Sequence, residues 1–190
     1  MILKRILPFA HSLLRAAVKE GDIAIDCTAG NGHDTVFLAQ LTGPSGKVYS
    51  FDIQEQAIQA TQQKIAELHL NDRVKVLKQS HSHVSHAIPA EEHGHVAAAI
   101  FNLGYLPGGD KSITTSGETT ISAINQLFSM MRQNGLIILV IYPGHPEGKN
   151  ERDQLIQFVA QLDQKKVHVA KYEFLNQKND PPFVIIMEKQ

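Results

Sequence analysis

Short apolar runs alternate with helix-like segments along this 190-residue chain, and this alternation limits the possible folds more than any other feature. It is typical of a mostly parallel sheet covered by helices. The runs predicted to be strands are residues 23–27, 47–52, 73–77, 96–101, 136–141, 167–174 and 183–188. The last two are joined without room for a helix, which predicts an antiparallel hairpin at the sheet edge. We therefore expect an α/β fold with a seven-stranded, mostly parallel sheet, an antiparallel C-terminal hairpin and helices on both faces.

Apolar residues with helical spacing fill most of the segments between these runs. The predicted helices are residues 8–19, 35–41, 54–68, 118–132 and 150–162. Residues 102–116 and 142–148 contain glycines and are predicted to be loops, whereas the histidine-rich residues 80–94 show little pattern. The length suits one domain of ordinary size, so residues 1–190 are expected to form a single domain.

Composition narrows the class of protein. Hydrophobic residues make up 43% and charged residues 19% of the chain, which is typical of a folded globular protein. A net charge of −1 gives no support to a protein that coats a long polyanion, although a local basic patch could still grip one RNA loop. No apolar stretch approaches the ~18 residues that span a membrane, and the first nine residues are too short for a signal peptide. The expected location is the cytoplasm, without a membrane partner.

Polar residues cluster where five of the predicted strands end. The clusters are residues 26–34, Asp52, Ser80-His81, residues 102–105 and residues 142–145. Core packing does not require polar residues at these points, and open parallel sheets bind ligands at the carboxyl ends of their strands. The sequence therefore predicts a binding site at this edge of the sheet.

The first cluster reads Asp26-Cys-Thr-Ala-Gly30-Asn-Gly32-His-Asp34 and follows a strand. A lone Gly-x-Gly shows only a tight turn. The dinucleotide-binding fingerprint has a third small residue at the position where this chain has Thr35. Asp34 at the start of the helix would also repel a pyrophosphate, because both are negatively charged. S-adenosylmethionine carries no phosphate; Asp26 could accept from its ammonium and the loop amides could bind its carboxylate. The loop thus favours this cofactor over NAD, and Asp34 could also simply cap the helix.

Asp52 ends the second strand about 20 residues after the glycine turn, where an acid accepts hydrogen bonds from ribose hydroxyls. The alternative is a solvated strand terminus. Ile53 could then pack on the adenine, and Ser80-His81 could read the adenine edge.

Phe101-Asn102-Leu103-Gly104-Tyr105 ends the fourth strand and should face the transferred methyl group. Enzymes that methylate exocyclic amines often carry Asn/Asp-Pro-Pro-Tyr/Phe there; this chain keeps the first and last residues and replaces both prolines. The Asn102 carbonyl could accept from a neutral amine and aim its lone pair at the methyl carbon, while Tyr105 could stack on a base or sugar. The alternative for Asn102 is a turn residue. His81, His83, Tyr105 or water could take the proton, and the sequence does not choose.

The ten histidines and the basic residues give weaker signals. The densest histidine cluster comprises His81, His83, His86, His93 and His95. Without a cysteine pair or a matching carboxylate motif, we expect no structural metal.

The basic residues that could meet a substrate are Lys4, Arg5, Lys111, Lys149 and Arg152. For Lys149 and Arg152, a phosphate contact and a solvated helix start are equally good interpretations.

These motifs together resemble one known family. They are Asp26-x-Thr28-x-Gly30-Asn31-Gly32-x-Asp34, Asp52-Ile53-Gln54, Ser80-His81, Asn102-Leu103-Gly104-Tyr105-Leu106-Pro107-Gly108-Gly109-Asp110-Lys111 and Tyr142-x-Gly144-His145-x-x-Gly148. Over nearly its whole length the chain resembles the bacterial tRNA 5-(aminomethyl)-2-thiouridine methyltransferases, which were first described as rRNA methylases. Many methyltransferases share the first two motifs, whereas the last two are far more specific.

The resemblance implies a Rossmann-like class I methyltransferase that uses S-adenosylmethionine to methylate the aminomethyl nitrogen of a tRNA wobble uridine, acting as a monomer or homodimer. It implies cofactor contacts by Asp26, Thr28, Gly30, Asn31, Gly32, Asp34, Asp52, Ile53, Gln54, Ser80, His81 and Asn102. The expected substrate contacts are Tyr105, Lys111, Tyr142, His145, Lys149 and Arg152, with Asn102 and Tyr105 catalytic and no metal. Another RNA or amine methyltransferase is the alternative, and a non-catalytic Rossmann-like binding module is a third reading.

Overall fold

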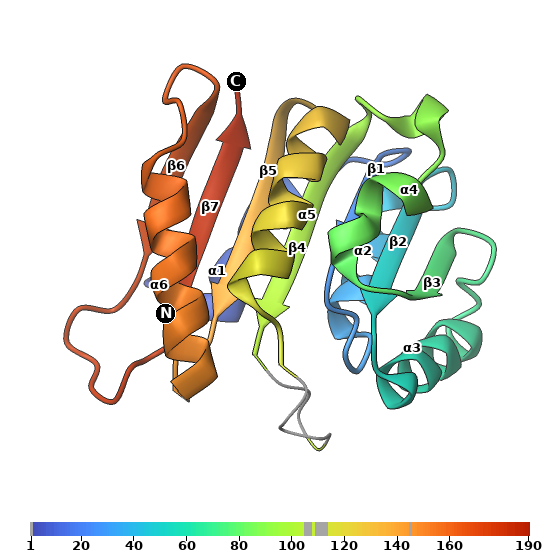
Figure 1. The fold of residues 1–190 in the computed structure, drawn as a ribbon. Helices are drawn as coiled ribbons and strands as arrows, with labels where there is room; N and C mark the ends of the chain where they lie inside the picture. Colours follow the sequence, from blue (N-terminus) through green and yellow to red (C-terminus); the bar gives the residue numbers. More distant parts are fainter. Residues whose placement is uncertain (1, 105–107, 109–113, 145) are drawn as a thin grey trace.

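A seven-stranded sheet forms the centre of the computed structural model, which describes residues 2–104, 108, 114–144 and 146–190 (Figure 1). The strands are β1 (Ile23–Asp26), β2 (Lys47–Asp52), β3 (Val74–Lys78), β4 (Val96–Leu103), β5 (Met131–Ile141), β6 (Val167–Tyr172) and β7 (Phe183–Lys189). Their order is β3-β2-β1-β4-β5-β7-β6. The pairs from β3 to β5 are parallel, whereas β7 pairs antiparallel with both β5 and β6. The predicted sheet and its C-terminal hairpin are confirmed.

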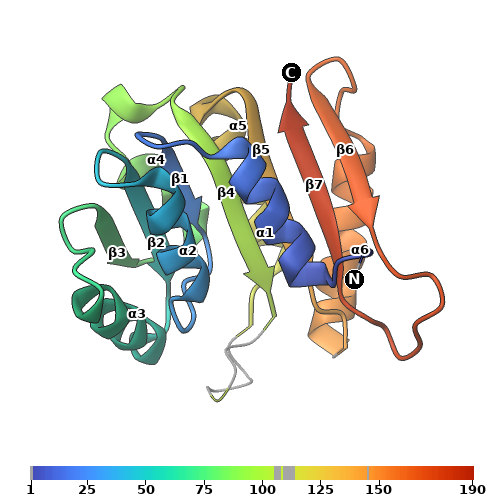
Figure 2. The same cartoon turned by 180° about the vertical axis from the view of Figure 1, so that it is seen from behind.

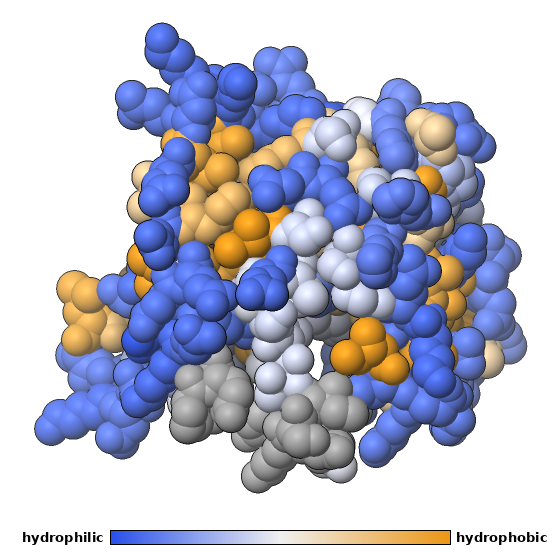
Figure 3. All heavy atoms as spheres, viewed as in Figure 1, coloured by the Kyte–Doolittle hydropathy of each residue, from blue (hydrophilic) through white to orange (hydrophobic). Residues whose placement is uncertain are grey.

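Helices cover both faces of the sheet, as the alternating pattern predicted. The helices α1 (Ile6–Ala17), α2 (His33–Thr42) and α3 (Glu55–Glu67) lie on one face (Figure 2). The other face carries α4 (Val84–Ala87), α5 (Gly117–Met130) and α6 (Pro146–Ala160) (Figure 1). Apolar colour reaches the surface of this second face between α6 and the β6–β7 hairpin, while most of the remaining surface is hydrophilic (Figure 3).

The central strands read as continuous apolar runs because both of their faces are buried. In β4, Phe101 packs into the core under α4–α6, while its neighbour Ile100 packs into the core under α1–α3. In β5, Ile137 packs into the core under α4–α6 and Ile138 packs into the core under α1–α3. Successive side chains of a strand point to opposite faces, so each run supplies both cores and fixes the sheet between its two helical layers.

The prediction for residues 131–135 is wrong. The sequence favoured a helix to residue 132 and a turn at Asn134-Gly135, but β5 already begins at Met131. Met131 pairs with Val96, the next partners are Leu136 and Ala98, and the register shifts between them. Asn134 has a φ of +60° inside this irregularity. The Asn-Gly pair therefore lies in an irregular part of β5, where the regular alternation that reveals a strand is lost.

Three smaller boundaries also differ. Helix α6 begins at Pro146 rather than at residue 150, because proline suits the first turn of a helix and Gly148 does not end it. Strand β4 continues to Leu103, so Asn102 lies within a strand rather than in a loop. The weakly patterned residues 80–94 form α4 between two 3-10 turns, η1 (His81–His83) and η2 (Ala90–Glu92).

The topology brings the polar strand ends together. The neighbours of β1 are β2 on one side and β4 on the other, so the chain reverses its direction across the sheet at β1. Helices from the two faces leave a crevice at such a point. The carboxyl ends of β1, β2, β4 and β5 therefore meet at the edge where the sequence predicted a site.

Candidate functional site

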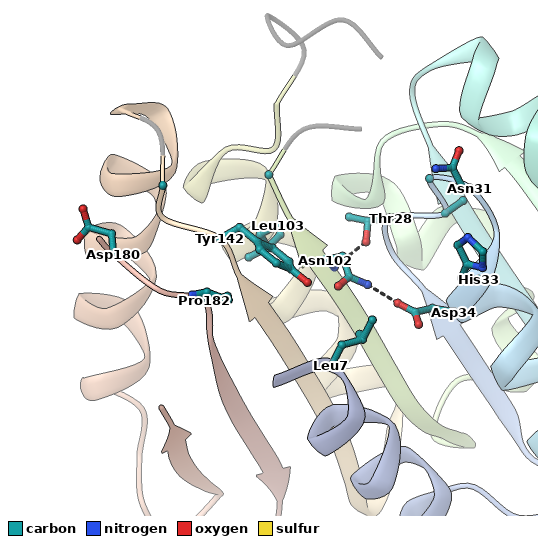
Figure 4. A pocket seen from close by; sticks show the side chains of 14 residues that line it. Leu7, Thr28, Asn31, His33, Asp34, Asn102, Leu103, Tyr142, Asp180 and Pro182 are labelled. Carbon is teal, nitrogen blue, oxygen red and sulfur yellow. Dashed lines mark hydrogen bonds between the residues drawn. The ribbon is translucent and has the colours of Figure 1, made fainter. Parts of the chain in front are cut away.

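Two neighbouring cavities occupy this edge of the sheet. The first, of about 610 Å³, is lined by Leu7, Thr28, Ala29, Gly30, Asn31, His33, Asp34, Asn102, Leu103, Gly104, Tyr142, Gly144, Asp180 and Pro182 (Figure 4). The second, of about 250 Å³, is lined by Cys27, Thr28, Gly30, Phe51, Asp52, Ile53, Gln54, Gln79, Ser80, His81, Asn102, Gly104, Thr114, Thr115, Ser116 and Thr119. Because they share Thr28, Gly30, Asn102 and Gly104, they form one elongated site across the ends of β1, β2 and β4.

The loop after β1 is held by its own polar groups. Gly30 and Gly32 have φ angles of +52° and +75°, in the left-handed region that favours glycine. The Asp26 carboxylate accepts from the Thr28 amide (3.1 Å) and from the Thr35 hydroxyl (2.6 Å). The Gly30 amide donates to Asp52 at 2.9 Å, which joins this loop to β2. The loop is therefore preorganised around the site.

Asp26 is fully buried and lines neither cavity. Burial, followed by the charge of Asp34, raises its pKa from 3.8 to about 7. The two hydrogen bonds direct its carboxylate toward the loop and helix α2. An ammonium contact by Asp26, which the sequence suggested, would require the loop to rearrange.

Stability should depend on pH through Asp26. Between pH 3.8 and about 7 the folded protein binds more protons than the unfolded chain at this residue, so the free energy of unfolding falls as pH rises through that window. The change is at most about 1.4 kcal/mol per pH unit. Asp26→Asn cannot ionise, so wild type should lose stability relative to this variant between pH 5 and 7 in urea unfolding. Parallel pH profiles would contradict this.

A side chain at Gly32 should destabilise the protein. A Cβ there would lie 3.1 Å from Thr61, and the positive φ would strain any other residue. Gly94 has a similar φ of +88° but open space around its Cβ position, which makes it a matched control. Gly94→Ala should lose about 1–2 kcal/mol from the backbone alone, and Gly32→Ala should lose more. Equal losses in chemical denaturation would show that the Thr61 contact has no cost.

Asp52 and Ile53 lie where the sequence predicted them, at the end of β2 and in the second cavity. The Asp52 carboxylate accepts from the Gln54 amide and from the Gly30 amide, both at 2.9 Å. Ile53 is 51% exposed, so its apolar side chain is open to a ligand in this cavity. The pair offers one acidic and one apolar contact to a ligand.

His81 reaches the second cavity from the first residue of η1. Its Nδ1 lies 2.9 Å from the Cys27 carbonyl, and burial lowers its pKa, so the ring is neutral and Nδ1–H donates. Its Nε2 is then an acceptor, and it has no hydrogen-bond partner in the part of the chain that the structure describes. The ring meets Phe101 edge to face. A buried acceptor without a partner is costly, and a ligand that donates a hydrogen bond would remove that cost.

Asn102 lies where the two cavities join, held by its backbone and its side chain. Its amide N–H donates to the Thr28 hydroxyl at 2.7 Å, and its side-chain Nδ2 donates to the Asp34 carboxylate (Figure 4). Because a carboxylate can only accept hydrogen bonds, this contact places the amide nitrogen toward Asp34 and the amide oxygen away from it. Oδ1 is left to accept a hydrogen bond from a group in the site.

Asp34 and Tyr142 form the opposite sides of the first cavity (Figure 4). Asp34 is buried in the first turn of α2, and its second oxygen lies 2.6 Å from His11 Nε2 on α1. Tyr142 is 40% exposed, and burial of its hydroxyl followed by the charge of Asp34 raises its pKa. Tyr142 and Leu7 are apolar lining residues of the first cavity, whereas Asp34 and Asn102 are polar ones.

Some predicted substrate residues are not brought together. Tyr105, Lys111 and His145 lie outside the described residues. Lys149 and Arg152 are on α6 and line neither cavity. Lys149 contacts Asp180 of the β6–β7 loop at 2.9 Å, whereas Arg152 pairs with Asp153 at 2.8 Å and lies 3.6 Å from Asp180.

Sequence reasoning missed several residues of the site. They are Leu7, His11, His33, Thr114, Thr115, Ser116, Asp180 and Pro182. The opening helix carried His11 without any motif, and only its contact with Asp34, 23 residues away, reveals it. Asp180 lies between the last two predicted strands, and the sequence indicated no role for it.

Among the described residues, no group of three or more His, Cys, Asp or Glu side chains is placed to hold a metal ion. No described helix is long and apolar enough to cross a membrane.

Comparisons with known proteins agree with this geometry. A family model described as "Putative rRNA methylase" matches residues 48–188. A chloroplastic tRNA (mnm(5)s(2)U34)-methyltransferase of Arabidopsis thaliana is 33% identical over 98% of this chain and 70% of its own length. The crystal structure of a Clostridium thermocellum protein described as a "putative rRNA-methylase" has a TM-score of 0.95 at 42% identity, covering 99% of both chains. A Streptococcus mutans protein described as "a putative methyltransferase", in complex with SAH, has a TM-score of 0.89 at 38% identity, also covering 99% of both chains.

Proposed function

This chain belongs to the family described as "Putative rRNA methylase", and from that premise we propose that it methylates the aminomethyl nitrogen of 5-aminomethyl-2-thiouridine at the tRNA wobble position. It is a methyltransferase that uses S-adenosylmethionine. The finer assignment to this nucleoside is supported by the Arabidopsis relative and by the geometry around Asn102.

The second cavity fits the adenosine half of S-adenosylmethionine. The Asp52 carboxylate faces the cavity and can accept from the two ribose hydroxyls. Ile53 offers an exposed apolar side chain for packing against adenine. His81 Nε2, buried and without a partner among the described residues, can accept from the exocyclic amino group of adenine. These three contacts match the chemistry of an adenosine.

The orientation of Asn102 is the single observation that carries the proposal of an amine substrate. When bound, S-adenosylmethionine supplies a methyl group on a cationic sulfur. The Asn102 side chain cannot rotate freely, because Asp34 holds Nδ2. Oδ1 can therefore accept an N–H of the incoming amine and direct its lone pair, and such positioning lowers the barrier of a displacement. This amide needs no covalent chemistry of its own.

The first cavity suits a nucleobase that carries this amine. Leu7 on α1 and Tyr142 after β5 both line this cavity, and an exposed tyrosine ring can stack on a base. Base stacking presents the substituent at position 5 to Asn102. Lys149 and Arg152 stand beyond Asp180 at the rim of this cavity, where RNA phosphates could compete for them.

Methyl transfer by the purified protein tests this proposal. The protein would be incubated with labelled S-adenosylmethionine and with either tRNA that carries the unmethylated aminomethyl nucleoside or ribosomal RNA. We expect label in tRNA alone, in a nucleoside with the mass of 5-methylaminomethyl-2-thiouridine. Label in ribosomal RNA alone would instead support the activity after which the family was named.

A further inference from the structure

We propose that Asp34 and His11 form a proton-exit pair: Asp34 takes the proton that the methyl-accepting amine must lose, and His11 passes it to solvent. This inference rests on the proposed function, since it requires an amine as the methyl acceptor. An alkylamine is mostly protonated at neutral pH, and its nitrogen has no lone pair until that proton leaves. A site for this reaction therefore needs a proton acceptor beside Asn102.

Asp34 is the carboxylate in the right place. It is only 6% exposed, and it lines the first cavity together with Asn102. One of its oxygens accepts from Asn102 Nδ2, and the other lies 2.6 Å from His11 Nε2. Figure 4 shows the Asp34 carboxylate directed at the Asn102 amide. A single carboxylate thus connects the residue that positions the amine with an imidazole on another helix.

His11 is held so that it connects the buried carboxylate with solvent. Its ring stacks on Phe37 with centroids 4.2 Å apart and an angle of 15° between the planes. Its side chain is 27% exposed, whereas that of Asp34 is 7% exposed. His11 lines neither cavity, and among the described residues of the site its hydrogen-bond partner is Asp34. A proton that leaves Asp34 for His11 therefore moves from the cavity toward water.

The other titratable groups near the pair are less suitable acceptors. Asp26 on β1 is fully buried outside both cavities, and Tyr142 after β5 has its pKa raised by burial and by Asp34. Arg15, on the same helix as His11, stands 5.2 Å over Phe37 and is a cation. His81 lines only the second cavity. His33 and Asp180 also line the first cavity, but His33 lies 3.3 Å from Lys64 and Asp180 lies 2.9 Å from Lys149. Asp34 is the base of this cavity that contacts Asn102.

The step balances in atoms and charge. The alkylammonium gives a proton to the Asp34 carboxylate and becomes a neutral amine. Its lone pair then forms the N–C bond to the methyl group while the C–S bond breaks, and that electron pair stays on sulfur as a neutral thioether. The nitrogen becomes a secondary ammonium. While Asp34 is ionised, Nε2–H of His11 donates to it. Once Asp34 is protonated, His11 exchanges with water to its Nδ1–H tautomer, Nε2 accepts the proton from Asp34, and the imidazolium releases a proton to water.

The test compares two substitutions of His11. His11→Gln keeps a hydrogen-bond donor toward Asp34 but cannot carry a proton, and His11→Ala leaves space that free imidazole can fill. Turnover would be measured from pH 6 to 9 with tRNA bearing the unmethylated nucleoside, and binding of S-adenosylhomocysteine by calorimetry. His86→Gln changes an exposed histidine outside both cavities and is the matched control.

We expect kcat of His11→Gln to fall roughly ten- to a hundredfold with an altered pH profile, while KM for tRNA and affinity for S-adenosylhomocysteine stay within twofold of wild type. Imidazole should restore turnover to His11→Ala, and His86→Gln should match wild type. Unchanged turnover, or a loss with the wild-type pH profile and no rescue by imidazole, would overturn the pair while leaving the proposed function intact. A wild-type protein that methylates no tRNA would defeat both.

Discussion

Replacing Asn102 by alanine should lower kcat at least a hundredfold while the protein still binds S-adenosylhomocysteine. The substitution removes Oδ1, the atom that positions the amine, and misplacement of a reacting group by about 1 Å can cost this much. The backbone bond from Asn102 to Thr28 does not need the side chain and should persist. Single-turnover methylation and calorimetry would be measured on the same preparation.

Two further variants sharpen this prediction. Asn102→Asp keeps an acceptor but loses the donor to Asp34 and places a second carboxylate beside it, so it should also lose most of its turnover. Asn71→Ala removes an exposed side-chain amide that lines neither cavity, so this variant should have wild-type turnover. Wild-type turnover in Asn102→Ala would remove this residue from the mechanism.

Replacing Asp52 by alanine should weaken cofactor binding by roughly one to two orders of magnitude. Hydrogen bonds to a charged group contribute about 1.5–3 kcal/mol, and Asp52 is the acid that faces the second cavity. The substitution also removes the acceptor of the Gly30 amide, which loosens the loop after β1. Titration calorimetry with S-adenosylhomocysteine measures the loss.

The control for Asp52 is an acid outside the site. Asp72 is exposed in the turn before β3 and lines neither cavity, so Asp72→Ala should bind the cofactor as wild type does. Asp52→Asn should fall between wild type and Asp52→Ala, because one oxygen can still accept. Equal affinities for wild type and Asp52→Ala would exclude a role for Asp52 at the ribose.

Local patterns predicted the sheet well because its central strands are buried on both faces. Runs such as residues 96–101 have no other stable position in a protein of this size. The same reasoning failed at residues 131–135, where an irregularity in the pairing of β5 with β4 interrupts the pattern that identifies a strand. It also placed the start of α6 four residues late, because glycine and proline are ambiguous at the beginning of a helix.

The sequence predicted the residue types of the site better than their contacts. Asp52, Ile53, His81 and Asn102 were found because each follows or ends a strand at the same edge of the sheet. Which acid of the glycine loop faces the cavity depends on side-chain directions, and these put Asp34 in the cavity and Asp26 behind it.

Long-range contacts were beyond local patterns altogether. Two of them change how the site is understood: His11 beside Asp34, and Asp180 beside Lys149. Neither His11 nor Asp180 belongs to a motif, and only the folded chain brings each to its partner.

Mass spectrometry of nucleosides from bulk tRNA, in cells with and without this gene, tests the proposed substrate in the cell. We expect that loss of the gene removes 5-methylaminomethyl-2-thiouridine and that the unmethylated aminomethyl nucleoside accumulates in its place. Restoring the wild-type gene should reverse both changes, and restoring the Asn102→Ala variant should not. Unchanged tRNA nucleosides after loss of the gene would contradict the proposed substrate.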